Sequence, residues 1–262
     1  MRVYLIVFMP NYEGIRKMQA LAANTSHSDP SSISEVCRVS LEVLVRNFKQ
    51  NSNSETELLV VLHNWVRDHI KFGFTADFET VSPGDTVKNG MGHCNAQADL
   101  LCHLLTLAGF ESRLAFVYID KEILRYAIPS LIYLILPHKL FHAVTQVNLE
   151  GKWVSIDSYI LTKNQFSNQM NKLVQKKTKH GFGLHSNSEC VWDGRNDCFS
   201  QAKNGDIDQF CEVYDNLAQA IKSRANTNRV LGVHFNSLLK PIATISRTGG
   251  RVFKHYINYY LH

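Results

Sequence analysis

Glycine and proline are scarce in this chain, with 14 and 6 among 262 residues, which is too few for a fibrous or low-complexity protein. Charged residues make up 19% of the chain and hydrophobic residues 45%. That balance excludes a wholly disordered chain and a coiled coil. The length suits one large domain or a domain with a substantial second lobe.

Long apolar runs are also missing. The run 123–136 contains Arg125 and Pro129 and is shorter than the roughly 20 residues of a membrane span, so no transmembrane segment is predicted. The apolar start of the chain, 1–10, is followed by Glu13 before any small-residue cleavage site. This favours a buried strand or helix start over a secretory signal. We therefore expect a cytoplasmic protein, and leave a secreted or exported form open.

Cysteine usage indicates neither a disulfide scaffold nor a zinc ribbon. The six cysteines include no Cys-x-x-Cys pair. His93, Cys94, Cys102 and His103 suggest a metal site, but on a helix residues 94 and 102 lie about 12 Å apart along the axis. A packed helix explains them better, so we predict no metal and no cofactor.

Positive charge is concentrated in residues 162–262, where 14 Lys and Arg stand against 7 Asp and Glu. The basic run 172–180 and the tail 247–254 raise the question of an anionic partner. No aromatic-interleaved nucleic-acid motif accompanies them, so we predict no nucleic-acid partner and interpret them as solvated faces. Contact with a membrane surface stays open, as does the oligomeric state.

Hydrophobic periodicity separates expected helices from expected strands. Helices are expected over about 35–49 (capped by Ser34), from Ser54 onward, and over 94–108, 162–175, 207–223 and 233–244. Strands are expected over 113–119, 142–149 and 152–157. Ser54 followed by Glu57 has the form of a capping box, and Gly109 is a suitable helix stop.

Cys94 stands where a glycine-rich turn meets the start of a helix. Gly90, Met91, Gly92 and His93 precede it. Unpaired N–H groups and the helix dipole at such a position favour a thiolate and can bind an oxyanion. A free cysteine is more often a small buried residue, so this motif alone leaves both interpretations open.

A predicted hairpin brings a histidine and an aspartate to one strand face. Residues 150–151 (Glu-Gly) suit a two-residue turn, and the numbers of facing residues then add to 301. Val144 would face Asp157, and His142 would lie diagonal to that aspartate, within reach of an imidazole–carboxylate bond. Together with Cys94 upstream, this is the arrangement of a nucleophile, a base and an orienting acid.

These motifs resemble the transglutaminase-like superfamily. Residues 92–114 look like its Gly-x-Cys motif, apolar helix, glycine and Arg-led strand, and 142–144 and 151–157 look like its His and Asp strands. Residues 58–74 resemble its lead-in helix, so the resemblance covers about 55–160. Residues 159–164, 181–183 and 192–194 resemble the C-terminal extension of bacterial members.

The resemblance implies an α+β papain-like fold in which a helix bearing the nucleophile packs on an antiparallel sheet. It implies Cys94 as nucleophile, His142 as general base and acid, and Asp157 as the orienter of His142. Animal transglutaminases have a tryptophan upstream of the cysteine that helps to bind the oxyanion, and papain-like proteases have a glutamine. The loop before Cys94 has neither, so the second oxyanion donor is not identified.

We expect three parts: an N-terminal helical segment (1–54), the catalytic core (55–160) and a largely helical C-terminal extension (161–262). The expected chemistry is acyl transfer from an amide or ester of a peptide, protein or other substrate, with hydrolysis first and transamidation a close second. The alternative is an inactive binding module of the same fold. Segment 121–140 is expected either to face the substrate or to pack against the C-terminal part.

Overall fold

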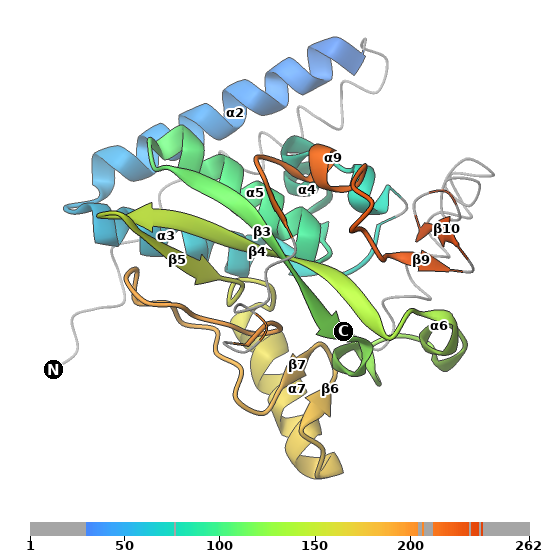
Figure 1. Ribbon diagram of the computed structural model, residues 1–262. Helices are drawn as coiled ribbons and strands as arrows, with labels where there is room; N and C mark the ends of the chain where they lie inside the picture. The colour runs from blue at the N-terminus through green and yellow to red at the C-terminus, as the bar shows by residue number, and fades with distance from the viewer. Residues whose placement is uncertain are drawn as a thin grey trace, which may run out of the picture.

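A four-stranded antiparallel sheet with helices stacked on it forms the centre of the protein in a computed structural model (Figure 1). The structure describes residues 30–75, 77–203, 206, 212–230, 232–235 and 237, with side chains from residue 41 onward. The strand order is β5-β4-β3-β8. This mixture of helices and an antiparallel sheet confirms the predicted α+β class.

The elements follow one another along the chain in a helical block and then a sheet block. The first block holds α2 (Pro30–Asn51), α3 (Glu55–His69), β1 (Lys71–Phe72), η1 (Phe78–Thr80), α4 (Pro83–Asn89), β2 (Met91–Gly92) and α5 (Cys94–Ala108). The second holds β3 (Ser112–Asp120), η2 (Lys121–Leu124), α6 (Ser130–Ile135), β4 (Lys139–Leu149) and β5 (Lys152–Ile156). The C-terminal part holds α7 (Lys163–Lys176), β6 (His180–Gly181), β7 (Leu184–His185), β8 (Glu212–Tyr214), α9 (Leu217–Ala220), β9 (Arg229–Val230) and β10 (Val233–His234).

Two of the three predicted helix-end signals, Ser54 and Gly109, are confirmed. The Ser54 hydroxyl accepts a hydrogen bond from the Glu57 backbone N–H, which confirms Ser54 as the cap. The Glu57 carboxylate accepts from the N–H of Asn53 and not from that of Ser54, so the capping box is half formed. Gly109 ends α5 with φ of 94°, a left-handed conformation that favours glycine. The cap expected at Ser34 is wrong, because α2 already begins at Pro30, where the missing N–H of proline suits the first helical turn.

The hairpin of β4 and β5 has the predicted register. Thr145 faces Ile156 and Leu149 faces Lys152, so the facing numbers do add to 301. Glu150 and Gly151 have φ of 53° and 87°, the paired positive values of a type I′ turn. This register carries His142 and Asp157 toward the same end of the hairpin.

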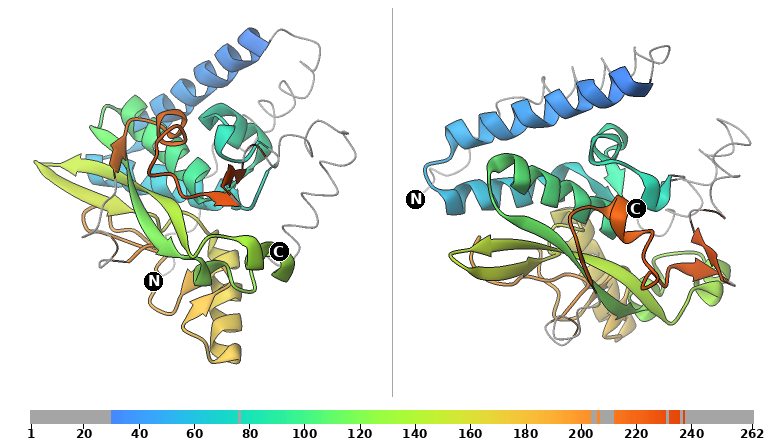
Figure 2. Two further views of the ribbon diagram at one scale, coloured as in Figure 1. Left: turned by 45° about the vertical axis from the view of Figure 1, so that its right-hand side comes forward. Right: turned by 45° about the horizontal axis from the view of Figure 1, so that its top comes forward.

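Helices α5, α3 and α2 lie in two layers on one side of the sheet. Helix α5 packs against β3 and β4, and α2 and α3 pack against α5 (Figure 2). Ala98, Leu101 and Leu105 of α5 are fully buried. Helix α5 is therefore a core helix that fixes its first residue, Cys94, relative to the sheet.

The C-terminal part differs from its expected elements. Helix α7 confirms the helix predicted over 162–175. The helix predicted over 207–223 is wrong in its described part, because 212–214 form β8, which pairs with the free edge of β3, and only α9 is helical. In the helix expected over 233–244, residues 233–234 form β10, whereas 235 and 237 are helical. The rest of that segment, apart from 235 and 237, lies outside the described residues, as does the strand or helix start expected over 1–10.

Two further features bear on the function. Strand β8 adds a strand from the C-terminal part to the sheet that carries His142, so the sheet is shared between the expected core and the extension. Within the described residues, no helix combines the length and apolarity needed to cross a bilayer.

Candidate active site

Cys94 is half-buried at the first position of α5. Gly90 ends α4 with φ of 58°, a left-handed value that favours glycine, and β2 then pairs with β1. A Cβ atom on Gly92 would lie 3.0 Å from Cγ2 of Thr86, so glycine lets this turn approach α4 closely. The turn thus sets the Cys94 thiol at a helix N-terminus, where backbone N–H groups have no helical partner.

His142 and Asp157 form a buried pair. Nε2 of the imidazole lies 2.8 Å from Oδ2 of the carboxylate, and the two side chains are 1% and 0% exposed. The other ring nitrogen, Nδ1, is buried and has no hydrogen-bond partner among the described residues. Since the carboxylate occupies Nε2, Nδ1 is the ring nitrogen that remains available for another partner.

The electrostatics of His142 link the pair to Cys94. Burial alone would lower the pKa of the imidazole. Negative charge on Cys94, together with the hydrogen bond and charge of Asp157, outweighs burial and raises this pKa from 6.5 to about 10. The surroundings therefore favour the protonated form of the His142 imidazole.

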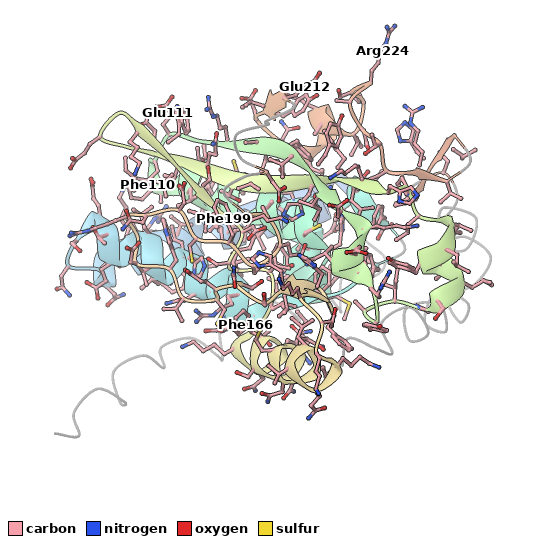
Figure 3. The ribbon with its side chains drawn as sticks, turned by 60° about the horizontal axis from the view of Figure 1, so that its bottom comes forward. Phe110, Glu111, Phe166, Phe199, Glu212 and Arg224 are labelled. Carbon is pink, nitrogen blue, oxygen red and sulfur yellow. The ribbon has the colours of Figure 1, made fainter. Side chains whose placement is uncertain are left out.

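The Asp157 carboxylate is held by backbone N–H groups of the C-terminal part. Ser200 and Ala202 donate to it at 2.5 and 2.7 Å, and Gln201 donates at 3.3 Å. Figure 3 labels Phe199, which directly precedes Ser200 in the chain. The Asp157 N–H in turn donates to the carbonyl of Cys198 at 3.1 Å. Residues 198–202 are thus part of the site.

Asn95 ties the start of α5 to the backbone on both sides of His142. Its Nδ2 donates to the carbonyl of Phe141 at 3.1 Å, and its Oδ1 accepts from the N–H of Ala143 at 2.8 Å. The Cys94 thiol lies 3.5 Å from the same Oδ1. This one side chain therefore fixes the position of the histidine relative to the cysteine.

A buried acid and a second asparagine extend this network. Glu79, only 2% exposed, accepts hydrogen bonds from Asn95 at 3.1 Å and from Asn228 at 2.6 Å, and burial raises the pKa of its carboxyl. Asn228 exchanges two hydrogen bonds with the backbone of Phe141. The strand carrying His142 is thereby held from two sides.

A cavity of about 240 Å³ opens beside Cys94 and His142, which both line it. Most of its other walls are aliphatic and aromatic side chains from 72–78, 119–140 and 230–235. Segment 121–140 also contacts the C-terminal part, because the N–H groups of 182 and 183 donate to the carbonyls of 125 and 123. The expected packing against the C-terminal part is therefore confirmed, and the same segment lines the cavity beside Cys94.

His93 and the neighbouring cysteine do not form a metal cluster. Among the residues whose positions are described, no three His, Cys, Asp or Glu side chains are grouped to hold a metal ion. The His93 ring instead stacks on Phe78 with centroids 4.2 Å apart. Burial, with a smaller effect of the charge on His142, lowers the pKa of His93 to about 3, so its ring is neutral.

Comparison with protein families now identifies the fold. Residues 42–158 match the model of the transglutaminase-like superfamily. Residues 42–158 are a transglutaminase-like core. The match contains Cys94, His142 and Asp157, and it confirms the resemblance and the papain-like type of the α+β fold. At this level the match supports a cysteine-based enzyme.

Other comparisons add little to the family match. A solved structure described as a "putative cysteine protease" from Cytophaga hutchinsonii is similar with 17% identity over 59% of this chain, and its TM-score is 0.34. The aligned part spans only 41% of that protein, and the likeness is too low to support an argument. No curated protein matches the sequence.

Several polar groups of this candidate site were not identified from the sequence. They are Glu79, Asn95, Asn228 and the backbone of 200–202. Asn95 could have been identified from the sequence, because it directly follows Cys94 of the recognised motif. The others come from distant segments and carry no local pattern that would connect them to His142.

Proposed function

We propose that Cys94, His142 and Asp157 act as a catalytic triad in acyl transfer from an amide or ester, with hydrolysis as the principal outcome. The supporting observation is the buried 2.8 Å bond between His142 and Asp157, which leaves Nδ1 of His142 for the cysteine. A nucleophile, a base and a group that orients the base are what this chemistry requires.

In the first step, Sγ of Cys94 attacks the carbonyl carbon, and the carbonyl electron pair moves onto oxygen. The backbone N–H of Cys94, in the first turn of α5, stabilises that oxyanion. When the carbonyl re-forms, the bond to the leaving group breaks. Nδ1 of His142 gives its proton to the leaving amine or alcohol, and a thioester remains on Cys94.

In the second step, an acceptor attacks the thioester carbon. Neutral His142 takes the proton of the acceptor at Nδ1, the carbon–sulfur bond breaks, and the thiolate returns. Water as the acceptor releases a carboxylic acid, and an amine gives a new amide. Transamidation is therefore the second candidate within one mechanism, and the substrate is a peptide, protein or other amide-bearing molecule.

The test is a substrate screen with activated esters and peptide amides on wild type and Cys94→Ala, read by intact mass and product analysis. We expect a thioester on Cys94, turnover in wild type alone, and more acid than amide when a primary amine is added. If more amide than acid forms, transamidation is the main reaction. A wild type that binds a partner but never forms the thioester would overturn the proposal in favour of a binding module.

A further inference from the structure

The cavity beside Cys94 is large enough to hold part of the substrate. Its volume of about 240 Å³ exceeds the roughly 150 Å³ of an apolar protein cavity that takes up benzene. Cys94 and His142 both line it. When the carbonyl of a substrate lies at Cys94, the acyl group attached to that carbonyl can therefore extend into the cavity.

Among the described residues, the wall of this cavity offers a substrate no charged group other than at Cys94 and His142. The other polar side chains that line it are His93, Asn95, Gln201 and Asn228. The two asparagines are engaged with Glu79 and the backbone of Phe141, and Gln201 donates to the carbonyl of Gly183 at 2.8 Å.

The remaining wall is aliphatic or aromatic, and its largest contribution comes from segment 121–140. Ile123, Leu124, Ile128, Leu136 and Leu140 line the cavity and are at least nine-tenths buried. Ile132 of α6 lines it too and is only partly buried, whereas Leu134 of the same helix is 70% exposed and does not line it.

We infer that this cavity binds an apolar acyl group, so that Cys94 prefers substrates whose carbonyl carries a hydrocarbon chain or a bulky apolar side chain. The inference rests on the proposed function, because it assigns the cavity to the acyl side of the scissile bond. A charged acyl group would be desolvated there without a partner. Each methylene that enters the cavity is expected to raise the acylation rate about fourfold.

The experiment measures acylation of Cys94 by four p-nitrophenyl esters, with each rate divided by that of the same ester with glutathione. The acetate is the short reference, the octanoate carries a hydrocarbon chain, the N-acetyl-leucine ester carries an apolar side chain, and the hydrogen succinate carries a charge. We expect the octanoate or the leucine ester to exceed the acetate by at least about tenfold and the succinate to be slowest. If the octanoate is faster than the leucine ester, the apolar group comes from a lipid-like chain. If the leucine ester is faster, it comes from a peptide.

Three variants locate the effect. Ile132→Trp fills the cavity from α6 and is expected to remove the advantage of the octanoate over the acetate. Leu134→Trp adds the same ring on the outer side of α6 and is expected to change neither rate. Ile132→Ala, which enlarges the cavity, should retain the preference even if Ile132→Trp does not fold.

The outcomes separate the two proposals. If none of the four esters acylates Cys94, the proposed function fails. If the acetate acylates Cys94 but the normalised rates are the same for all four esters, only the inference about the cavity fails. An advantage of the octanoate that persists in folded Ile132→Trp would also overturn it.

Discussion

Removal of the Asp157 carboxylate is expected to destabilise the fold as well as the site. The side chain is fully buried and accepts from the N–H groups of Ser200, Gln201 and Ala202 as well as from His142. In Asp157→Ala these donors lose their acceptor, and each unsatisfied buried group costs about 1–3 kcal/mol. We therefore expect a loss of about 4 kcal/mol or more in the free energy of unfolding.

Asp157→Asn should fall between wild type and Asp157→Ala. One oxygen accepts from Ser200 and the other from Ala202, so either orientation of the amide sets its NH₂ against a backbone N–H. The expected cost is about 2 kcal/mol.

Urea denaturation near neutral pH measures both values, with Asp197→Ala as the matched control. Asp197 is exposed and accepts from the single backbone N–H of Ser155 at 2.8 Å, so its loss should cost about 1 kcal/mol or less. If Asp157→Ala costs no more than Asp197→Ala, or if Asp157→Asn is as stable as wild type, the backbone donors do not hold the carboxylate as described.

Three further changes test other parts of the structure. Gly92→Ala sets a Cβ 3.0 Å from Cγ2 of Thr86 and should cost about 1–3 kcal/mol in urea unfolding, part of which Thr86→Ser in the same chain should restore. Burial raises the pKa of Asp99 from 3.8 to about 6, so its stabilising contribution is present below the lower value and lost as pH rises through the higher one. Asp99→Asn should accordingly gain up to about 3 kcal/mol relative to wild type between about pH 4 and 7 in pH-dependent unfolding. Asn95→Ala should slow alkylation of Cys94 about tenfold and alter its pH profile, because both bonds that bracket His142 are lost.

Each of these has a contradicting result. A Gly92→Ala protein as stable as wild type would show that the turn does not need its close approach to α4. If the free energies of unfolding of Asp99→Asn and wild type differ by the same amount at all pH values, the pKa of the buried Asp99 carboxyl is not raised. For Asn95→Ala, an unchanged pH profile with only lower stability would assign the residue a structural role alone.

The sequence predicted those parts of the fold that local patterns determine. Cys94 starts the predicted helix because a glycine-rich turn precedes it, and Gly109 ends that helix. The turn at 150–151 set the register of the hairpin and, through it, the proximity of His142 and Asp157. In each case the information lies within a few residues of the feature it determines.

The groups that support the site depend on long-range contacts. Glu79 meets Asn228 across 149 positions of sequence, and Ser200 meets Asp157 across 43. Strand β8 was predicted as a helix because the free edge of β3, which stabilises it, is about a hundred residues away in the chain. Tertiary pairing of this kind overrides local propensity and has no local signature.

The most direct test of the triad is the rate of iodoacetamide alkylation at Cys94 as a function of pH, in wild type and His142→Ala. Burial raises the pKa of Cys102 and of Cys198 to about 12, so these thiols serve as unreactive references in the same peptide digest. We expect rapid alkylation of Cys94 at about pH 6, where an ordinary thiol is protonated, and loss of that reactivity in His142→Ala. Slow alkylation at that pH, equal in the two proteins, would contradict the pairing of Cys94 with His142.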